Sequence, residues 1–180
     1  MRHIDIVLFS ASSPLLCGVY ENNTLIEQVQ SNELLLVALP RVFESLLPTP
    51  KQNPAYADSK INAIYYANGP GSFSALKLTH IFLHTLSNLY DIRLFATSSF
   101  YFTQSAYIRA FGTSCFYRNE NGEISLVQNV NQDVSNQNAI NQNTTDSGVM
   151  KNNASFFLPQ RLDKSAFNLP TEPLYILPPL

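Results

Sequence analysis

The order of apolar segments in the first half of the chain constrains its fold more than any other feature of the sequence. Three strand-like runs come first and are joined by short links, at residues 4–9, 15–20 and 24–30. Short links between consecutive strands predict an antiparallel meander, and Glu-Asn-Asn at 21–23 is a hairpin turn signal. Two predicted helices and two further strands then alternate, over residues 31–47, 61–67, 73–90 and 92–99. This order predicts an α/β fold with a mixed sheet.

The predicted helix over 31–47 is apolar on more than one side. Ser31 or Asn32 can cap its start, with Glu33 in the first turn. Apolar residues recur at helical spacing, at Leu35, Leu39, Val42, Phe43 and Leu46. Apolar surface spreads round the first two turns through Leu34, Leu36 and Val37. Pro40 removes one backbone donor and is predicted to kink the helix. Such a helix usually has two burial partners, its own sheet and here a candidate second chain.

The remaining segments carry weaker signals. Residues 48–60 form a polar, proline-rich loop, and 115–128 predict a hairpin about Asn121-Gly122. Residues 128–153 are rich in Asn and Gln, with too little apolar surface to offset the entropy of ordering, so we expect a long mobile loop. The apolar, proline-rich tail over 172–180 is expected to pack back as an extended edge.

Charge and cysteine content narrow the classes of function. Net charge is −2 and Lys and Arg do not cluster, so a large direct nucleic-acid footprint is not expected. Cys17 and Cys115 are isolated thiols outside any CxxC motif, which fits a reducing cytosol. The N-terminal residues predict a strand rather than a signal peptide, and no run approaches the roughly 18 apolar residues of a membrane helix. We therefore expect a cytoplasmic protein without a membrane contact.

The sequence Asn-Gly-Pro-Gly-Ser-Phe at 68–73 joins a predicted strand to a predicted helix, where many proteins hold a phosphate. A P-loop needs four residues between its glycines followed by Gly-Lys-Ser/Thr, and Gly69 and Gly71 are separated by one residue. A dinucleotide fingerprint needs a third glycine where Ser74 stands. Both motifs fail, which leaves only the general attraction of the amides of Gly71, Ser72 and Phe73 for an anion.

The helix after this turn carries Lys77, His80 and His84 on one face. The two histidines have the i, i+4 spacing of zinc helices, but the acid of an H-E-x-x-H motif is absent and no third ligand can be nominated. A polar stripe facing solvent or a partner is the alternative. Two catalytic alternatives have little support in the sequence. A nucleophile formed by Cys115 and a histidine would be a chance pairing, since the sequence gives no geometry for it. Paired carboxylates could do acid–base chemistry, but the candidate acids lie in predicted turns, at Asp58, Asp91, Glu120 and Glu123.

Residues 68–100 resemble the signature region of the TsaB (YeaZ) family, whose usual form is Gly-Pro-Gly-Ser-Phe-Thr-Gly-Leu-Arg, a helix, and a strand ending in Val-Ser-Ser-Leu. The match without gaps covers Gly69, Pro70, Gly71, Ser72, Phe73, Leu76, Ser98 and Ser99. Lys77 stands where the family usually has arginine. Residues 35–47 resemble the family's first helix with its internal Leu-Pro, and 172–177 resemble its closing Glu-Pro-x-Tyr-Leu.

This resemblance implies an actin/Hsp70-like (ASKHA), ribonuclease H-like fold of two lobes. We expect a first lobe over 1–105 and a reduced second lobe over 106–180 that contains the 128–153 loop and the tail. It also implies a role in making threonylcarbamoyladenosine (t6A) beside the anticodon of tRNAs that read codons starting with A. A TsaC-type enzyme makes threonylcarbamoyl-AMP, and a TsaD-type enzyme transfers the group to tRNA.

Within such a pathway, TsaB is a non-catalytic partner that binds a TsaD-type transferase through its first-lobe helices and is joined by a TsaE-type ATPase. It can also self-associate, and tRNA is contacted indirectly. We expect no cofactor on this chain itself, with ATP only at an interface with partners, and no metal. The predicted interface residues are Leu35, Leu39, Phe43, Lys77, His80 and His84.

One departure from the family bears on activity. The first strand of family members usually ends in Asp-Thr, where the acid of ASKHA proteins serves a metal–phosphate site, and Ser10 stands there in this chain. This departure argues against ATP hydrolysis. Two alternatives stay open, a nucleotide-binding ASKHA phosphotransfer enzyme and a metallopeptidase-like protein of the kind once labelled glycoprotease.

Overall fold

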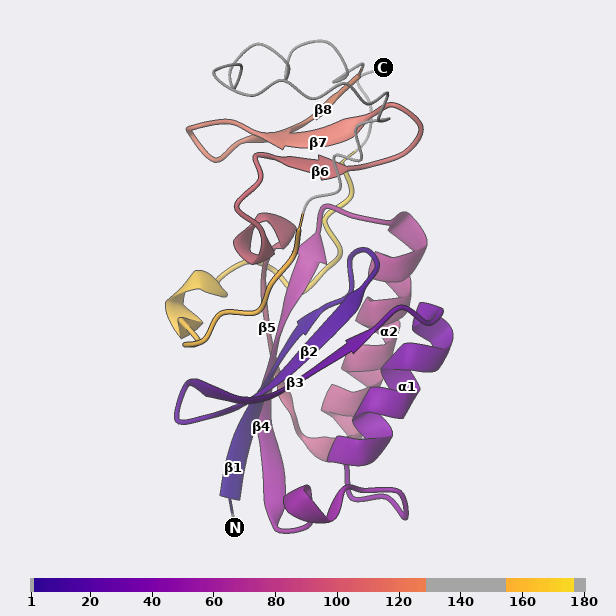
Figure 1. The fold of residues 1–180 in the computed structure, drawn as a ribbon, viewed down its shortest axis with the longest axis vertical. Helices are drawn as coiled ribbons and strands as arrows, with labels where there is room; N and C mark the ends of the chain where they lie inside the picture. Colours follow the sequence, from indigo (N-terminus) through magenta and orange to yellow (C-terminus); the bar gives the residue numbers. More distant parts are fainter. Residues whose placement is uncertain (1, 129–154, 177–180) are drawn as a thin grey trace, which may run out of the picture.

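Five strands form the main sheet, in the order β3-β2-β1-β4-β5 (Figure 1). The computed structural model describes residues 2–128 and 155–176. The antiparallel meander consists of β1 (Arg2–Phe9), β2 (Leu15–Glu21) and β3 (Thr24–Ser31). The parallel part adds β4 (Ser59–Gly69) beside β1 and β5 (Arg93–Ser98) beside β4. The predicted α/β fold with a mixed sheet is therefore confirmed, as are its meander and its two later strands.

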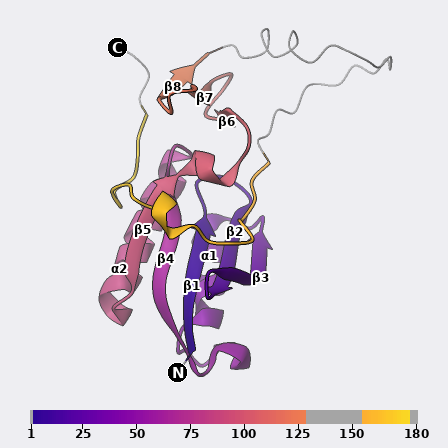
Figure 2. The ribbon, with the colours of Figure 1, turned by 90° about the vertical axis from the view of Figure 1, so that its left-hand side faces the viewer.

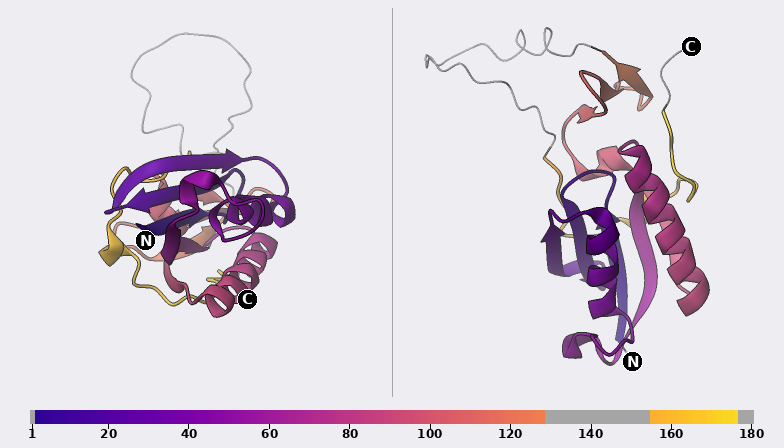
Figure 3. Two further views of the ribbon diagram at one scale, coloured as in Figure 1. Left: turned by 90° about the horizontal axis from the view of Figure 1, so that it is seen from below. Right: turned by 90° about the vertical axis from the view of Figure 1, so that its right-hand side faces the viewer.

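Helices α1 (Leu35–Leu46) and α2 (Phe73–Tyr90) lie side by side on one face of this sheet (Figure 3). The alternation of β1 sends Ile4, Ile6 and Leu8 into the core beneath the helices. The Phe43 and Phe82 rings join the two helices, with centroids 5.4 Å apart. Neither helix, nor any other in the described part of the chain, is long and apolar enough to cross a membrane.

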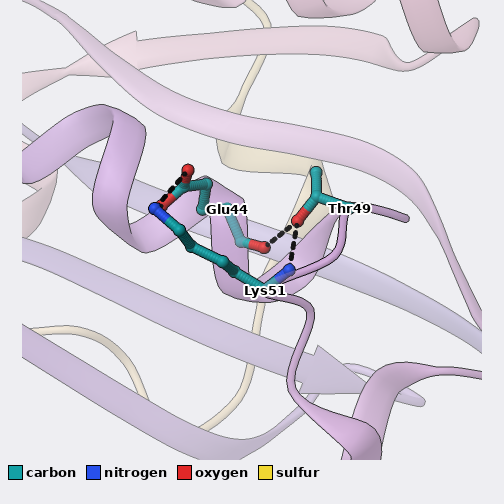
Figure 4. Close-up of polar contacts among 3 residues, drawn as sticks. All are labelled: Glu44, Thr49 and Lys51. Carbon is teal, nitrogen blue, oxygen red and sulfur yellow. Dashed lines mark hydrogen bonds and ion pairs between the residues drawn. The ribbon is translucent and has the colours of Figure 1, made fainter.

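The start of α1 differs from the sequence-based expectation. Its N-cap is Leu34, no side chain caps it, and its first turn holds no acid. Ser31 instead ends β3 and accepts a hydrogen bond from the Glu33 amide. Its side chain therefore stabilises the turn between strand and helix and does not cap the helix. At its other end Glu44 accepts hydrogen bonds from Thr49 and Lys51, which closes the chain back on the helix (Figure 4).

The opposite face of the sheet is covered by the segment over 155–167, which ends in the 3₁₀ turn η4 (Lys164–Ala166) (Figure 2). Leu158, Leu162 and Phe167 from this segment pack on a second core that includes Val7 and Phe9 of β1. The Tyr20 hydroxyl donates to the Pro159 carbonyl oxygen at 2.5 Å. Main-chain pairing at the sheet edge adds a bond from the Leu25 amide to the Gln160 carbonyl at 3.0 Å.

A small antiparallel sheet follows the 3₁₀ turn η2 (Ser99–Phe102) and lies beyond one end of the main sheet (Figure 1). Its strands are β6 (Tyr107–Arg109), β7 (Cys115–Arg118) and β8 (Ile124–Val127). The β7–β8 pair is the predicted 115–128 hairpin, and Gly122 in its turn has a φ of +83°. The predicted Asn/Gln-rich loop lies outside the described residues except for Gln128, and the division into lobes at residue 105 stays a prediction.

Candidate functional site

The turn over 69–72 connects the end of β4 to the start of α2, as the sequence predicts. Its two glycines are each in close contact with the main chain of another segment. A Cβ on Gly69 would lie 2.6 Å from the Leu174 carbonyl oxygen, and the Gly69 φ of +134° disfavours any other residue. A Cβ on Gly71 would collide with the Ala11 carbonyl oxygen. The turn is therefore a junction where three segments of the chain meet.

One amide group at this turn is already hydrogen-bonded within the chain. The Ser72 N–H, at the N-cap of α2, donates to the Ala11 carbonyl oxygen at 2.8 Å. This carbonyl occupies the place at the helix N-terminus where a phosphate oxygen would bind in a phosphate loop. Gly71 also packs directly on Ala11, so the loop after β1 contacts two of the three residues whose amides the sequence offered to an anion.

The C-terminal strap, residues 168–176, crosses the carboxyl ends of β4 and β5. The Leu169 amide donates to the Ala96 carbonyl at 3.0 Å, and the Leu174 amide donates to the Asn68 carbonyl at 2.8 Å. Two side chains of β4 hold the middle of the strap. The Tyr66 hydroxyl donates to the Thr171 carbonyl at 2.6 Å, and the Asn68 amide group donates to the Pro170 carbonyl at 2.9 Å. In α/β sheets ligands bind at this edge, and here a segment of the chain itself fills it.

Of the two histidines of the predicted stripe, His80 contacts the strap and His84 lies beside His80. The His80 Nδ1 is 3.2 Å from the Thr171 carbonyl oxygen, and the His80 and His84 ring centroids are 4.2 Å apart. The His84 Nε2 is enclosed and has no hydrogen-bond partner among the described residues. Burial and then the neighbouring His80 lower the pKa of His84, against a smaller opposing effect of Glu172. Both histidines are half-buried, and Lys77 is the exposed residue of the stripe.

The histidine pair does not extend to a metal centre in the described part of the chain. Within residues 2–128 and 155–176, no three His, Cys, Asp or Glu side chains come together in a metal-binding group. A zinc site needs at least three protein ligands, and the pair supplies two.

The interface residues predicted on α1 need correction. Leu39 and Phe43 are each 1% exposed and form the core between α1 and the sheet, and Leu35 is half-buried against the same core. These positions share the sheet-facing side of the helix because they are spaced by three or four residues. The solvent-facing side of α1 instead presents Leu34, Leu36 and Val37. The sequence showed this second apolar side, but the hydrophobic spacing alone could not tell which side meets the sheet.

The outer face of α2 has its own exposed apolar residues. Phe73 and Ile81 are exposed and flank Lys77 at steps of four residues, so all three lie on one side of the helix. The Phe73 ring contacts the Tyr175 ring of the strap, with centroids 4.6 Å apart. Sequence inspection assigned Phe73 to the turn and left Ile81 out of the interface, although the i, i+4, i+8 spacing of 73, 77 and 81 carried the signal.

The catalytic alternatives find no support in the geometry. Ser10, which stands where the resemblance leads us to expect an acid, is buried, and its Oγ is 2.8 Å from the Thr79 Oγ1 of α2. Burial raises the pKa of the Cys17 thiol to about 12 and also raises that of Cys115. Both thiols therefore stay protonated at neutral pH and are poor nucleophiles. The four acids of the predicted turns are exposed side chains, at Asp58, Asp91, Glu120 and Glu123.

Comparison with solved structures identifies the fold. The chain is similar to YeaZ from Pseudomonas aeruginosa, with a TM-score of 0.50 and 16% sequence identity over 71% of this chain and 65% of that one. An uncharacterized protein with similarity to peptidase YeaZ from Pseudomonas aeruginosa gives a TM-score of 0.47 and 14% identity, over 71% and 64% of the two chains. The match thus spans just under two thirds of the length of each neighbour. No protein-family model and no curated protein sequence matches this chain. The mixed α/β fold is shared with YeaZ, in agreement with the predicted ASKHA class.

Proposed function

We propose that this chain is a non-catalytic partner subunit in threonylcarbamoylation of tRNA, and that it binds a TsaD-type transferase through α1 and α2. The observation that carries the proposal is the YeaZ-like fold with two adjacent helices on one face of the sheet, both of which expose apolar side chains. The signature turn at 69–72 supports it, because that turn sets where α2 begins. A TsaE-type ATPase would join this pair, and tRNA would be contacted through the partner.

Both helices expose large apolar side chains that a partner could bury. Leu34, Leu36 and Val37 follow one another at the start of α1, and Phe73 and Ile81 lie on α2. The nearby Arg41 is paired with Glu33, so its charge is partly compensated. Fully burying one such leucine contributes about 1.5–3 kcal/mol, which offsets part of the entropic cost of association.

A non-catalytic role agrees with the state of the groups that could do chemistry. Ser10 replaces the acid of the phosphate site and is bonded to Thr79, while the strap and Ala11 cover the edge of the sheet where a nucleotide would bind. A nucleotide-binding phosphotransfer enzyme would need these segments to move away. A metallopeptidase would need a third metal ligand beside His80 and His84.

The direct test is binding to the TsaD-type protein of the same organism, measured by calorimetry and by co-purification. Leu36→Glu places a charge on the proposed interface and is expected to weaken the complex at least tenfold, since it replaces apolar burial by desolvation of a carboxylate. Phe111→Glu is the control, because Phe111 is 59% exposed against 69% for Leu36 and lies between β6 and β7, outside both helices. Equal affinities for the two variants would contradict the assignment of this face.

A second measurement separates the remaining alternatives. Calorimetry of the isolated chain with ATP and ADP in the presence of Mg²⁺ is expected to show no heat of binding. Tight, magnesium-dependent binding would favour the phosphotransfer enzyme instead. A t6A assay with and without this chain tests the role itself: modification by the reconstituted partners should depend on its presence and should fall with Leu36→Glu.

A further inference from the structure

β1 and β4 begin at the end of the main sheet opposite the 69–72 turn (Figure 1). A hollow of about 200 Å³ lies at this end. The residues that line it are His3, Lys60, Ile61, Asn62, Asp91 and Arg93. Strand register explains why basic side chains gather here. His3 of β1 is the partner of Lys60 in β4, and Ala63 of β4 is the partner of Arg93 in β5. Three neighbouring strands thus each bring one basic residue to a single hollow.

The cations of this hollow are free to bind a ligand. Lys60 and Arg93 are exposed and form no ion pair with any residue in 2–128 or 155–176. Four other cations of the same part of the chain are each paired with an acid, namely Arg2, Arg41, Lys51 and Lys164. Two unpaired cations in one hollow create a positive potential that a small anion can use.

The guanidinium of Arg93 is held in place by a chain of polar contacts. Its Nη2 donates to the Asn62 Oδ1 at 2.7 Å, and the Asn62 Nδ2 donates to the Asp5 Oδ1 at 3.0 Å. Asp5 is buried, and its Oδ2 is 2.7 Å from the Lys164 Nζ. These contacts use one of the five N–H donors of Arg93. The other donors keep the planar fork that matches the oxygens of a phosphate group.

Two features limit how much negative charge the hollow can hold. Asp91 contributes a carboxylate to its wall, and the C-terminal end of α2 adds roughly half a negative charge through the helix dipole. Against these stand the full charges of Lys60 and Arg93. The balance favours one small anionic group over a polyanionic ligand.

We propose that the Lys60–Arg93 hollow is a binding site for a single phosphate group, supplied either by inorganic phosphate or by one phosphodiester of an RNA backbone. Lys60 supplies a point charge, Arg93 supplies oriented N–H donors, and His3 lies at the rim. The site is separate from the helix face assigned to the protein partner, since it lies at the far end of α2. Its existence does not depend on the proposed role in tRNA modification.

The test is an NMR titration of the full chain with sodium phosphate at constant ionic strength, with sodium chloride as the balancing salt. The amides of Lys60, Asn62 and Arg93 are expected to shift with a saturable curve. Lys60→Gln and Arg93→Gln should each weaken binding about fivefold, the effect of losing one exposed charge contact. Asp91→Asn should strengthen it by a similar factor. Asparagine tolerates the left-handed backbone of residue 91, with its φ of 55°, so this variant keeps the fold.

Lys77→Gln is the control, since it removes an exposed cation that lies far from the hollow. Lys77 precedes Asp91 by 14 residues along α2, which at a rise of 1.5 Å per residue is about 21 Å. Shifts that stay linear up to high phosphate concentration, or an equal effect of Lys60→Gln and Lys77→Gln, would overturn the proposal. A second titration uses an unmodified tRNA transcript. Saturable shifts of the same amides, lost in the Lys60→Gln/Arg93→Gln double variant, identify an RNA phosphodiester as the source. Saturation by phosphate without tRNA shifts identifies free phosphate.

Discussion

Three separate variants, Gly69→Ala, Gly71→Ala and Gly112→Ala, test whether backbone segments meet at the 69–72 turn. Gly71 has an ordinary φ, so a methyl group there meets only the steric obstacle of Ala11. Such overpacking costs about 1–3 kcal/mol. Gly112 is the complementary case, with a φ of +57° and nothing within 4 Å of the added Cβ, so Gly112→Ala costs only the backbone strain of about 1–2 kcal/mol.

Gly69 combines both costs. Its φ of +134° lies in a region that is costly for alanine by about 1–3 kcal/mol, and the added Cβ would lie 2.6 Å from the Leu174 carbonyl oxygen. With overpacking of about 1–3 kcal/mol, Gly69→Ala should lose roughly 2–6 kcal/mol unless the strap moves away. The expected order of destabilisation is therefore Gly69→Ala above Gly71→Ala and Gly112→Ala.

Thermal unfolding followed by circular dichroism measures these losses, since each kcal/mol lowers the Tm of a chain of this size by about 2–4 °C. Hydrogen exchange at the Leu174 amide shows whether the strap detaches. Faster exchange is expected in Gly69→Ala and not in Gly71→Ala. A Gly71→Ala protein with an unchanged Tm would refute the close packing of the turn on Ala11.

Three further predictions concern ionisable side chains. The pKa of His84 is lowered in the fold, so the native state binds fewer protons than the unfolded state, and stability should fall as pH drops below about 6.5. Denaturation between pH 7.5 and 5 should show this loss, and His84→Gln should reduce it. Cys17, with a pKa raised to about 12, should react with iodoacetamide far more slowly than half-buried Cys115 in the native protein, and equally fast in denaturant. Asp5→Asn should lower the free energy of unfolding by about 1–3 kcal/mol in urea titration, because it leaves Lys164 without its partner; an unchanged midpoint would show that this pair contributes nothing.

Local sequence patterns were sufficient for the strands and helices of the first half of the chain. The meander, the two helices and the hairpin about Gly122 follow from alternation, helical spacing and turn chemistry, which are properties of neighbouring residues. The same patterns marked the 69–72 turn and showed that it fits neither phosphate motif, but they did not show what its glycines contact. The residues of the turn do not predict that Ala11 and Leu174 lie against its glycines, because these two residues are some 60 and 100 positions away in the sequence.

The sequence-based choice of interface residues was incomplete for a related reason. Leu39 and Leu36 are both leucines of one helix, and only the position of the sheet decides that the first is core and the second is surface. The strap likewise contacts His80 through the Thr171 carbonyl oxygen, which lies some 90 residues away in the sequence. The Lys60–Arg93 hollow depends on the register of three strands, which no single segment encodes.

The packing of the turn also links stability to the proposed partner face. Ala11 on one side and Leu174 on the other fix the turn, and the turn fixes the first residue of α2. Phe73 is that first residue, and its ring both contacts Tyr175 and stays exposed to a partner. A change at Gly69 that releases the strap should therefore weaken partner binding without touching any interface residue, whereas Leu36→Glu should weaken binding with the Tm unchanged. This contrast separates residues that shape the face from residues that contact the partner.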